Sequence, residues 1–209
     1  LDTLTIRYPE SDYRERIARW RSVVSERSTV KLGVLLPLMR NSEPSAIKDI
    51  GNEVLDGVLF AVEQYERDPS VRVRVTLETK DTERDAKVAA RLVQDLVDEK
   101  EVVGIIGPVF SASTSAAAGI ANARGVPLVS PTANANGIAG IGKYVFQANP
   151  DYDTRGRAMA RYAISKRGYK TLAVLSPMDS YGRFMAEGFI SEALKLGAKI
   201  VATEWYQRG

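Results

Sequence analysis

The sequence predicts an α/β protein with a doubly wound parallel sheet, and two observations support this. Short apolar, β-branched runs recur along the chain after residue 29, and longer segments with apolar residues at helical spacing separate them. Strands that alternate with helices of this length are typical of βαβ units, whose strands are parallel. The expected strands are 30–36, 71–77, 102–106, 126–129, 144–146, 172–175 and 200–205.

Helical patterns fill the intervals between these strands. Apolar residues recur every three or four positions in the first two intervals, as on one face of a helix. They are Val54, Val58, Ala61, Val62 and Tyr65, followed by Ala89, Leu92, Val93, Leu96 and Val97. The next segment, 116–123, is rich in alanine, which suits close packing on a sheet. Two further helices are expected over 154–166 and 182–196.

Residues 1–29 differ from the rest of the chain. Asp12 and Glu15 have the spacing of a capping box, and an apolar stripe at helical spacing follows. The stripe is Tyr13, Ile17, Trp20 and Val24. This predicts an N-terminal amphipathic helix, which packs on the following domain or belongs to a helical region upstream.

One connection breaks the regular alternation and predicts a domain boundary. Residues 130–142 are rich in Gly, Ser, Pro and Asn, and such a stretch does not form an ordinary crossover helix. We expect the chain to leave one sheet here and enter another. The expected regions are a helical leader and linker over 1–29, a first lobe over 30–143, and the start of an incomplete second lobe over 144–209.

The composition weighs against several functional classes. The chain has no Cys and no His, which excludes thiol nucleophiles, disulfides, His-based triads and the usual zinc sites. Because the most common general base is missing, we expect no enzyme, and we expect neither a metal nor a cofactor. The net charge is only +3, and the basic residues of 14–21 are interleaved with acidic ones. This favours a solvated helix face over nucleic-acid binding.

Two loops follow strands at the edge where parallel sheets bind ligands. In residues 107–115, hydroxyl side chains stand where free helix N–H groups and the helix dipole favour a carboxylate. Residues 130–134 carry small polar side chains that suit a zwitterionic ligand. The alternatives are that Ser111 or Ser113 only caps the helix, and that the second loop is an ordinary turn.

Other loops show no nucleotide-binding motif. The stretch 104–107 lacks the dinucleotide spacing, and no Gly-Lys-Ser/Thr follows it. Thr82 and Asp85 have the spacing of a capping box, which we interpret as structural. Tyr181 precedes a helix of the second lobe, where its ring either covers a ligand or packs.

Several motifs, in order from about residue 31 to 209, resemble the type I periplasmic-binding fold, specifically the branched-chain amino-acid receptor family. They are Lys31-Leu32-Gly33-Val34-Leu35-Leu36-Pro37-Leu38, Asp56-Gly57, Ile105-Ile106-Gly107-Pro108, Val126-Pro127-Leu128-Val129-Ser130-Pro131-Thr132-Ala133, Tyr144-Val145-Phe146 and Ser180-Tyr181-Gly182. The resemblance implies two Rossmann-like lobes that close on a small molecule. It also implies that two loops of the first lobe hold a ligand carboxylate, and that the other lobe contributes an aromatic residue. The residues at the matching positions are Ser111, Ala112 and Ser113 in one loop, Thr132, Ala133 and Asn134 in the other, and Tyr181 in the second lobe.

Two positions depart from the family pattern. Many members carry Thr at the position of Asn134, and the loop 39–50 lacks the usual Ser-Gly-Pro turn and an aromatic near its end. The resemblance therefore does not fix which amino acid is bound. Family members also continue for well over a hundred residues beyond the point that matches residue 209.

The expected function is reversible binding of a small polar solute, an amino acid, amide or short peptide, for uptake or sensing. The expected partners are this ligand, with a carboxylate, and the membrane permease of an ABC transporter. The expected location is periplasmic, with or without a lipid anchor. One alternative is an interaction module of the same fold that regulates a partner such as a cell-wall synthase. The other is the sensor domain of a transcription regulator. An incomplete lobe exposes apolar edges, so this chain is also expected to dimerise.

Overall fold

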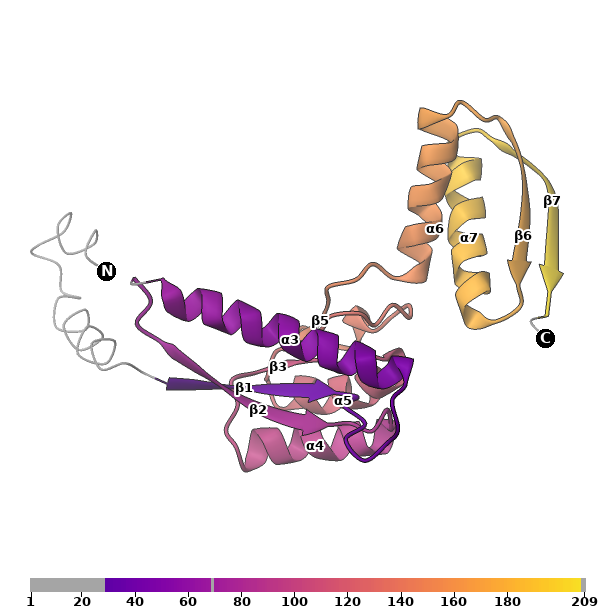
Figure 1. The fold of residues 1–209 in the computed structure, drawn as a ribbon. Coiled ribbons are helices and arrows are strands. Elements are labelled where there is room, and N and C mark those ends of the chain that lie inside the picture. Colours follow the sequence, from indigo (N-terminus) through magenta and orange to yellow (C-terminus); the bar gives the residue numbers. More distant parts are fainter. Residues whose placement is uncertain (1–28, 69, 208–209) are drawn as a thin grey trace, which may run out of the picture.

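The computed structural model describes residues 29–68 and 70–207, which form two parallel sheets (Figure 1). The first sheet has the strand order β2-β1-β3-β4-β5, and the second pairs β6 with β7. The strands are β1 (Thr29–Leu36), β2 (Arg74–Asp81), β3 (Gly104–Ile106), β4 (Leu128–Ser130), β5 (Val145–Gln147), β6 (Thr171–Pro177) and β7 (Lys199–Tyr206). The predicted parallel α/β fold is confirmed. The helix predicted within residues 1–29 lies outside the described residues.

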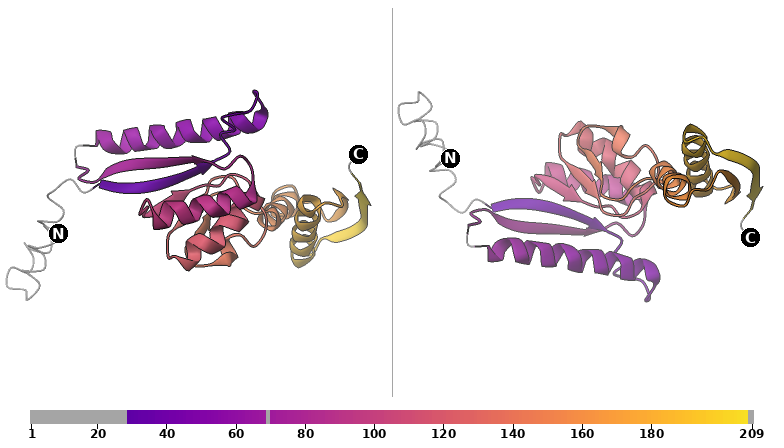
Figure 2. Two further views of the ribbon diagram at one scale, coloured as in Figure 1. Left: turned by 90° about the horizontal axis from the view of Figure 1, so that it is seen from below. Right: turned by 90° about the horizontal axis from the view of Figure 1, so that it is seen from above.

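The central strand β1 explains the layering of the first sheet. Successive side chains of a strand point to opposite faces, so Leu35 faces one layer while Val34 and Leu36 face the other. Leu35 packs with residues of α4 (Ala86–Asp98) and α5 (Ser111–Ala123), and Val34 and Leu36 pack with α3 (Ala46–Arg67). Figure 2 shows α3 on the opposite side of the sheet from α4 and α5. Burial on both faces explains why the second half of β1, residues 32–36, is an unbroken apolar run, whereas Thr29 and Lys31 in the first half are exposed.

The edge strand β2 lies further along the chain than the sequence predicted. It begins at Arg74 rather than at residue 71, and it continues to Asp81. Its register explains the shift, because all eight residues pair with β1, from Thr29 opposite Arg74 to Leu36 opposite Asp81. The polar residues 78–81 are therefore held in the strand by its partner and not by their own β propensity.

The helix α4 begins at a different residue from the one predicted. Asp85 is its N-cap, and its carboxylate accepts the N–H groups of Lys87 and Val88 at 2.7 and 2.9 Å. Thr82 is buried instead, and its N–H donates to the carbonyl of Leu36 at 2.8 Å. The capping box with Thr82 as its first residue was wrong, because Thr82 is required to continue the contact between β2 and β1.

The change of sheet occurs later than the sequence predicted. Strand β5 pairs in parallel with β4, with Leu128 opposite Val145, so it belongs to the first sheet and not to the second. Val145 is buried in a cluster with Ala118 and Ile138, which explains why the chain returns to this sheet after the irregular segment. We call residues 29–147 the first unit, 148–151 the crossover and 152–207 the second unit. The boundary expected between residues 143 and 144 therefore lies four residues too early.

The second unit packs two helices on its two strands. Helix α6 (Tyr152–Arg161) continues into a π-helical turn (Tyr162–Lys166), and α7 (Ser180–Lys195) lies beside it. Glycines allow this close approach, because a Cβ at Gly156 would lie 2.1 Å from the Met185 carbonyl oxygen. A Cβ at Gly188 would lie 2.6 Å from the carbonyl oxygen of Asp153.

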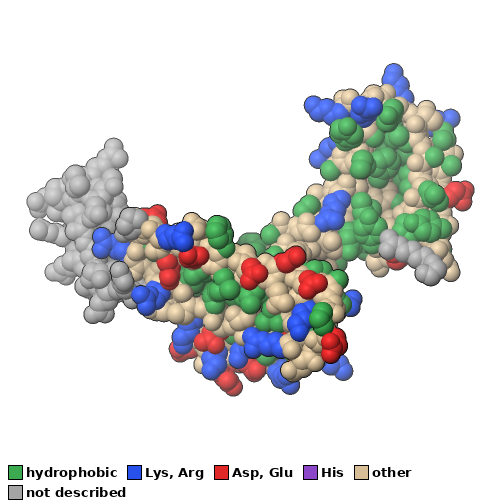
Figure 3. All heavy atoms as spheres, viewed as in Figure 1, with side chains coloured by type: hydrophobic (Ala, Val, Ile, Leu, Met, Phe, Trp, Pro, Cys, Tyr) green, Lys and Arg blue, Asp and Glu red, His purple; other side chains and the backbone are tan. Residues whose placement is uncertain are grey.

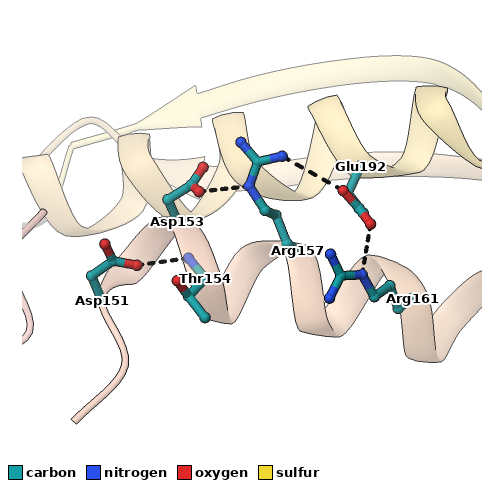
Figure 4. A network of polar contacts seen from close by, with 6 residues as sticks. All are labelled: Asp151, Asp153, Thr154, Arg157, Arg161 and Glu192. Carbon is teal, nitrogen blue, oxygen red and sulfur yellow. Dashed lines mark hydrogen bonds and ion pairs between the residues drawn. The ribbon is translucent and has the colours of Figure 1, made fainter. Parts of the chain in front are cut away.

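A carboxylate on α7 joins the two helices through arginines of α6 (Figure 4). Glu192 accepts from Nε of Arg161 at 2.6 Å and lies 3.5 Å from Nη1 of Arg157. Arg157 also contacts Asp153 at 2.6 Å, one turn earlier on α6. The hydrogen bond from Arg161 lowers the pKa of Glu192 below its ordinary value of 4.5, although burial acts in the opposite direction.

Gly107 connects β3 to α5 in a conformation that other residues rarely adopt. Its φ is +99°, and a Cβ would lie 2.1 Å from the carbonyl oxygen of Leu35. The backbone of the loop after β3 therefore lies directly against the end of β1, and only glycine allows this contact.

We predict that Gly107→Ala lowers the free energy of unfolding by at least about 2 kcal/mol, since a strained φ and a steric overlap each cost about 1–3 kcal/mol. Gly119→Ala, within α5 and with open space around a Cβ, is the matched control. It should raise stability by about 0.5–1 kcal/mol. Urea denaturation of both variants measures the difference, and equal stabilities would contradict the packing of Gly107.

We predict that Glu192 makes the stability of the second unit depend on pH. A carboxylate whose pKa is lowered on folding stabilises the protein above its unfolded pKa, and this stabilisation is lost as the pH falls below 4.5. Glu192→Gln should therefore show a weaker loss of stability on acidification than the wild type. Glu187→Gln, which breaks an exposed ion pair with Arg183 on the same helix, is the control. Identical pH profiles for wild type and Glu192→Gln in denaturant titrations would refute this.

Candidate ligand-binding site

The strand order of the first sheet identifies one edge as the place for a ligand. The order reverses between β1 and β3, and open α/β sheets bind ligands beyond the carboxyl ends of the strands at such a point. The loops after β1, β3 and β4 meet there. Together with the first turn of α5, they contain six of the seven residues that the sequence predicted for the site.

Ser111 joins two of these loops instead of capping its helix. Its Oγ accepts the N–H groups of Asn134 and Ala135 at 3.3 and 3.2 Å. The N-cap of α5 is Phe110, and among the described residues no side chain caps this helix end. The alternative that Ser111 or Ser113 is only a cap is therefore contradicted.

The next two residues of α5 differ in exposure. Ala112 is exposed, whereas Ser113 is only 2% exposed. The Ser113 hydroxyl finds no hydrogen-bond partner in the described part of the chain. Because buried hydroxyls are nearly always satisfied, this group requires an explanation. Ser113 lies in the first turn of α5, two residues after Ser111.

The second loop is fixed by bonds to its neighbours. The Thr132 hydroxyl donates to the carbonyl of Val109 at 2.8 Å, which ties this loop to the one after β3. Ala133 is buried, and its N–H donates to the hydroxyl of Ser130 at 3.2 Å. The side-chain amide of Asn134 is hydrogen-bonded to none of the residues that the structure describes, so it is available to a ligand.

A buried pair of hydroxyls holds the two loops together, and the sequence reasoning missed it. Ser130 and Thr114 both donate to the carbonyl of Pro108, at 2.6 and 3.0 Å, and their oxygens lie 3.3 Å apart. Both residues are fully buried. A polar residue at the end of a buried strand, as at Ser130, was the available signal, but its partner lies sixteen residues away in the sequence.

Gln147 is a second residue that the sequence reasoning missed. Its amide nitrogen donates to the carbonyls of Ala133 and Ala135 at 3.2 and 3.1 Å, and its oxygen accepts the N–H of Ala139 at 3.0 Å. Gln147 ends β5, next to the loop that follows β4. Only the position of β5 in the first sheet brings it there.

The loop after β1 is held by a carboxylate at the end of β2. Asp81 accepts the N–H groups of Met39 at 3.1 Å and of Arg40 and Glu83 at 2.9 Å. Burial raises the pKa of Asp81, but these backbone hydrogen bonds outweigh burial and leave the pKa below its ordinary value. The charged form is therefore the stable one, and it orders this side of the site.

Arg84 adds positive charge near the first turn of α5. Its guanidinium carbon lies 5.1 Å from the centre of the Phe110 ring, in the geometry of a cation–π contact. Phe110 directly precedes Ser111. A cation close to a helix N-terminus strengthens the attraction of that terminus for an anion.

Tyr181, the seventh predicted residue, lies in the second unit at the start of α7. Its ring meets that of Tyr152 edge to face, with the ring centres 5.1 Å apart. The N–H of Tyr152 in turn donates to the carbonyl of Asn134 at 3.2 Å. Tyr152 therefore stands between the predicted aromatic and the loop of the first unit.

Two surface hollows lie away from these loops. One is lined by Glu66 and residues 71–74, and the other by Met178, Arg183, Glu187 and Trp205. Within residues 29–68 and 70–207, no three acidic side chains gather as metal ligands would. No helix in the described part of the chain has the length and apolar character that a membrane span requires.

Residues 29–209 match the family described as periplasmic binding protein. The chain belongs to this family. Its members bind solutes outside the cytoplasm and are not enzymes. The predicted resemblance to branched-chain amino-acid receptors is confirmed by the relatives of this periplasmic binding protein.

One relative is a chemotactic signal transduction substrate-binding protein of Halobacterium salinarum, 31% identical over 86% of this chain and 44% of its own. A Rhodospirillum rubrum protein assigned to branched-chain amino acid ABC transport has a TM-score of 0.77 and 25% identity, covering 87% of this chain and 51% of that one. A leucine-binding protein of Thermotoga maritima has a TM-score of 0.62 and 28% identity, covering 86% and 49%. This periplasmic binding protein thus spans about half the length of these relatives.

Proposed function

We propose that this chain is part of an extracytoplasmic solute-binding protein that reversibly binds a small polar ligand through a carboxylate. The state of the Ser111 hydroxyl supports this most directly. Its oxygen already accepts two N–H groups, from Asn134 and Ala135, which occupy both lone pairs. The hydroxyl hydrogen can then only be donated, and no acceptor for it lies within the described residues. The Ser111 hydroxyl can therefore bind a ligand that offers a hydrogen-bond acceptor.

The surroundings of Ser111 favour an acceptor with negative charge. The first N–H groups of α5 have no intrahelical partners, and the positive end of the helix dipole lies there. The charge of Arg84, which lies beside Phe110, is also positive. Hydrogen bonds to a charged group contribute about 1.5–3 kcal/mol, more than bonds to a neutral one. A carboxylate is therefore preferred over a neutral carbonyl.

An amino acid, an amide or a short peptide is the class of ligand that fits best. The leucine-binding protein of Thermotoga maritima and an amino acid binding protein of Pseudomonas aeruginosa, 25% identical over 65% of this chain, support it. The free amide of Asn134 offers both a donor and an acceptor to such a ligand. The identity of the side chain that is bound is open, because Asn134 replaces the Thr of many family members.

The two units correspond in this proposal to two lobes of a clamp. Closure around the ligand would be a hinge motion about the crossover, and it would bring Tyr181 over the loop that contains Asn134, to which Tyr152 is already bonded. The loaded protein would deliver its ligand to the membrane permease of an ABC transporter or to a sensor. We place it in the periplasm, and a lipid anchor is compatible with this location.

We predict that Ser111→Ala weakens amino-acid binding by ten- to a hundredfold, corresponding to a loss of about 1.4 kcal/mol per decade. Stability should fall as well, by about 1–3 kcal/mol, because two N–H groups lose their acceptor. Titration calorimetry of the full-length protein against the common L-amino acids and acetamide measures binding, and urea denaturation measures stability.

Two further variants make this experiment selective. Ser115→Ala removes an exposed hydroxyl from the same helix and should change neither quantity. Ser111→Thr retains a hydroxyl and should retain most of the binding. Equal affinities for wild type and Ser111→Ala would refute the role of Ser111. If the wild type binds none of these compounds, the rival function, a module of the same fold that regulates a partner protein, is favoured.

We also propose that this 209-residue chain self-associates through the second unit. Hydrophobic side chains gather over α6 and α7, and Leu175 on β6 is 72% exposed (Figure 3). Light scattering should give a mass above that of the monomer. Leu175→Asp should lower it, whereas Thr171→Asp, at an exposed polar position on the same strand, should not. A monomeric wild type at all concentrations would exclude self-association.

A further inference from the structure

Every carbonyl of the loop 132–135 is bound by a residue at or next to the crossover. Asn149 Nδ2 donates to the Thr132 oxygen at 3.0 Å, and the N–H of Tyr152 donates to that of Asn134 at 3.2 Å. Gln147 Nε2 donates to the other two carbonyl oxygens, at 3.2 and 3.1 Å. Four consecutive backbone groups of the candidate ligand loop thus depend on residues 147–152.

Tyr152 is the first residue of α6, and within the crossover Asn149 is the residue whose side chain bonds both the ligand loop and α6. Its Oδ1 accepts a hydrogen bond from Nη2 of Arg155 at 2.8 Å, and Arg155 is the fourth residue of α6. The same guanidinium donates through Nε to the carbonyl of Pro150 at 3.1 Å. Asn149 therefore has one end of its amide on the ligand loop and the other on the first helix of the second unit.

We propose that Asn149 is a positioning residue that couples the shape of the ligand loop to the position of the second unit, through Thr132 on one side and Arg155 on the other. The expected consequence is that ligand affinity depends on the position of α6, and this consequence rests on the proposed function. A rotation of α6 about the crossover moves Arg155. The side-chain amide of Asn149 is planar and rigid. Its Nδ2, which donates to Thr132, therefore moves together with its Oδ1, which accepts from Arg155.

The coupling has to act in both directions. A ligand that binds one arrangement of the loop more tightly stabilises the position of α6 that goes with it. By linkage, α6 in that position raises ligand affinity by the same factor. Residues that never touch the ligand then contribute to its affinity, and Arg155 is the one that the structure identifies.

Three variants test the two hydrogen bonds of the Asn149 side chain separately. Asn149→Asp keeps an oxygen for Arg155 but replaces the donor to Thr132 by an acceptor, which breaks only the contact with the loop. Arg155→Ala removes the bond from α6 to Asn149, together with the bond of the same guanidinium to the Pro150 carbonyl, and it leaves the bond between Tyr152 and Asn134 in place. The control is Arg183→Ala, since Arg183 lies on α7 in an exposed ion pair with Glu187.

The first measurement needs no ligand and follows hydrogen exchange of the loop amides. In Arg155→Ala, the N–H groups of Asn134 and Ala135 should exchange up to about tenfold faster, as for the loss of one charge-assisted bond. A purely local role of Arg155 would change exchange only in residues 149–156. Unchanged rates at Asn134 and Ala135 would overturn the proposal, and Arg183→Ala should leave them unchanged.

The second measurement uses L-leucine as the probe on the full-length protein. Arg155→Ala should weaken its binding up to about tenfold, and the effect should largely disappear when Asn149→Asp is already present. Additive effects would show that the two residues act separately and would overturn the coupling. If wild type does not bind L-leucine, the ligand assignment fails for this probe, and the exchange experiment alone decides on the coupling.

Discussion

The carbonyl oxygen of Pro108 accepts two buried hydroxyls, from Thr114 and Ser130, and the candidate site depends on this contact. It fixes the loop after β3 against the loop after β4 at the point where both leave the sheet. A buried carbonyl or hydroxyl without a partner is costly, so each of the three groups holds the other two in place. Gly107 allows the arrangement, because its backbone lies against Leu35 where no side chain fits.

Above this contact, the polar groups of the loops are bonded to one another, and few are left for a ligand. Ser111 accepts two N–H groups, Thr132 donates to Val109, and the carbonyls of 132–135 are bound by residues 147–152. Among the described residues, the remaining groups are the Ser111 hydrogen, the Ser113 hydroxyl, the first N–H groups of α5 and the amide of Asn134. Loops ordered in this way would lose little conformational entropy on binding the proposed ligand.

The two units differ in how completely they are packed, and this bears on their roles. The first sheet has helices on both faces, and β1 is buried between them. The second has one helical layer, joined by the carboxylate of Glu192, and β6 and β7 expose large apolar side chains such as Leu175. The first unit is well packed, and the crossover that connects it to the second unit is only four residues long. This arrangement is suited to motion of the second unit about the crossover. Under the proposed coupling, the two bonds of Asn149 transmit such motion to the loop 132–135.

The sequence alone determined the alternation of strands and helices, the parallel sheet, and the loop that contains Ser111, because periodicity and turn residues are local properties. It also indicated Thr132, Ala133 and Asn134 by their place after a strand. Only the tertiary structure decided that β5 returns to the first sheet, since that depends on a register with β4 and on the burial of Val145 beside Ala118 and Ile138. It also decided that Ser111 is a bridge and not a cap, and that Gln147, Asn149 and Ser130 support the site. Each of these depends on partners twelve or more residues away, and hydrogen bonds over such a distance leave no periodic signal in the chain.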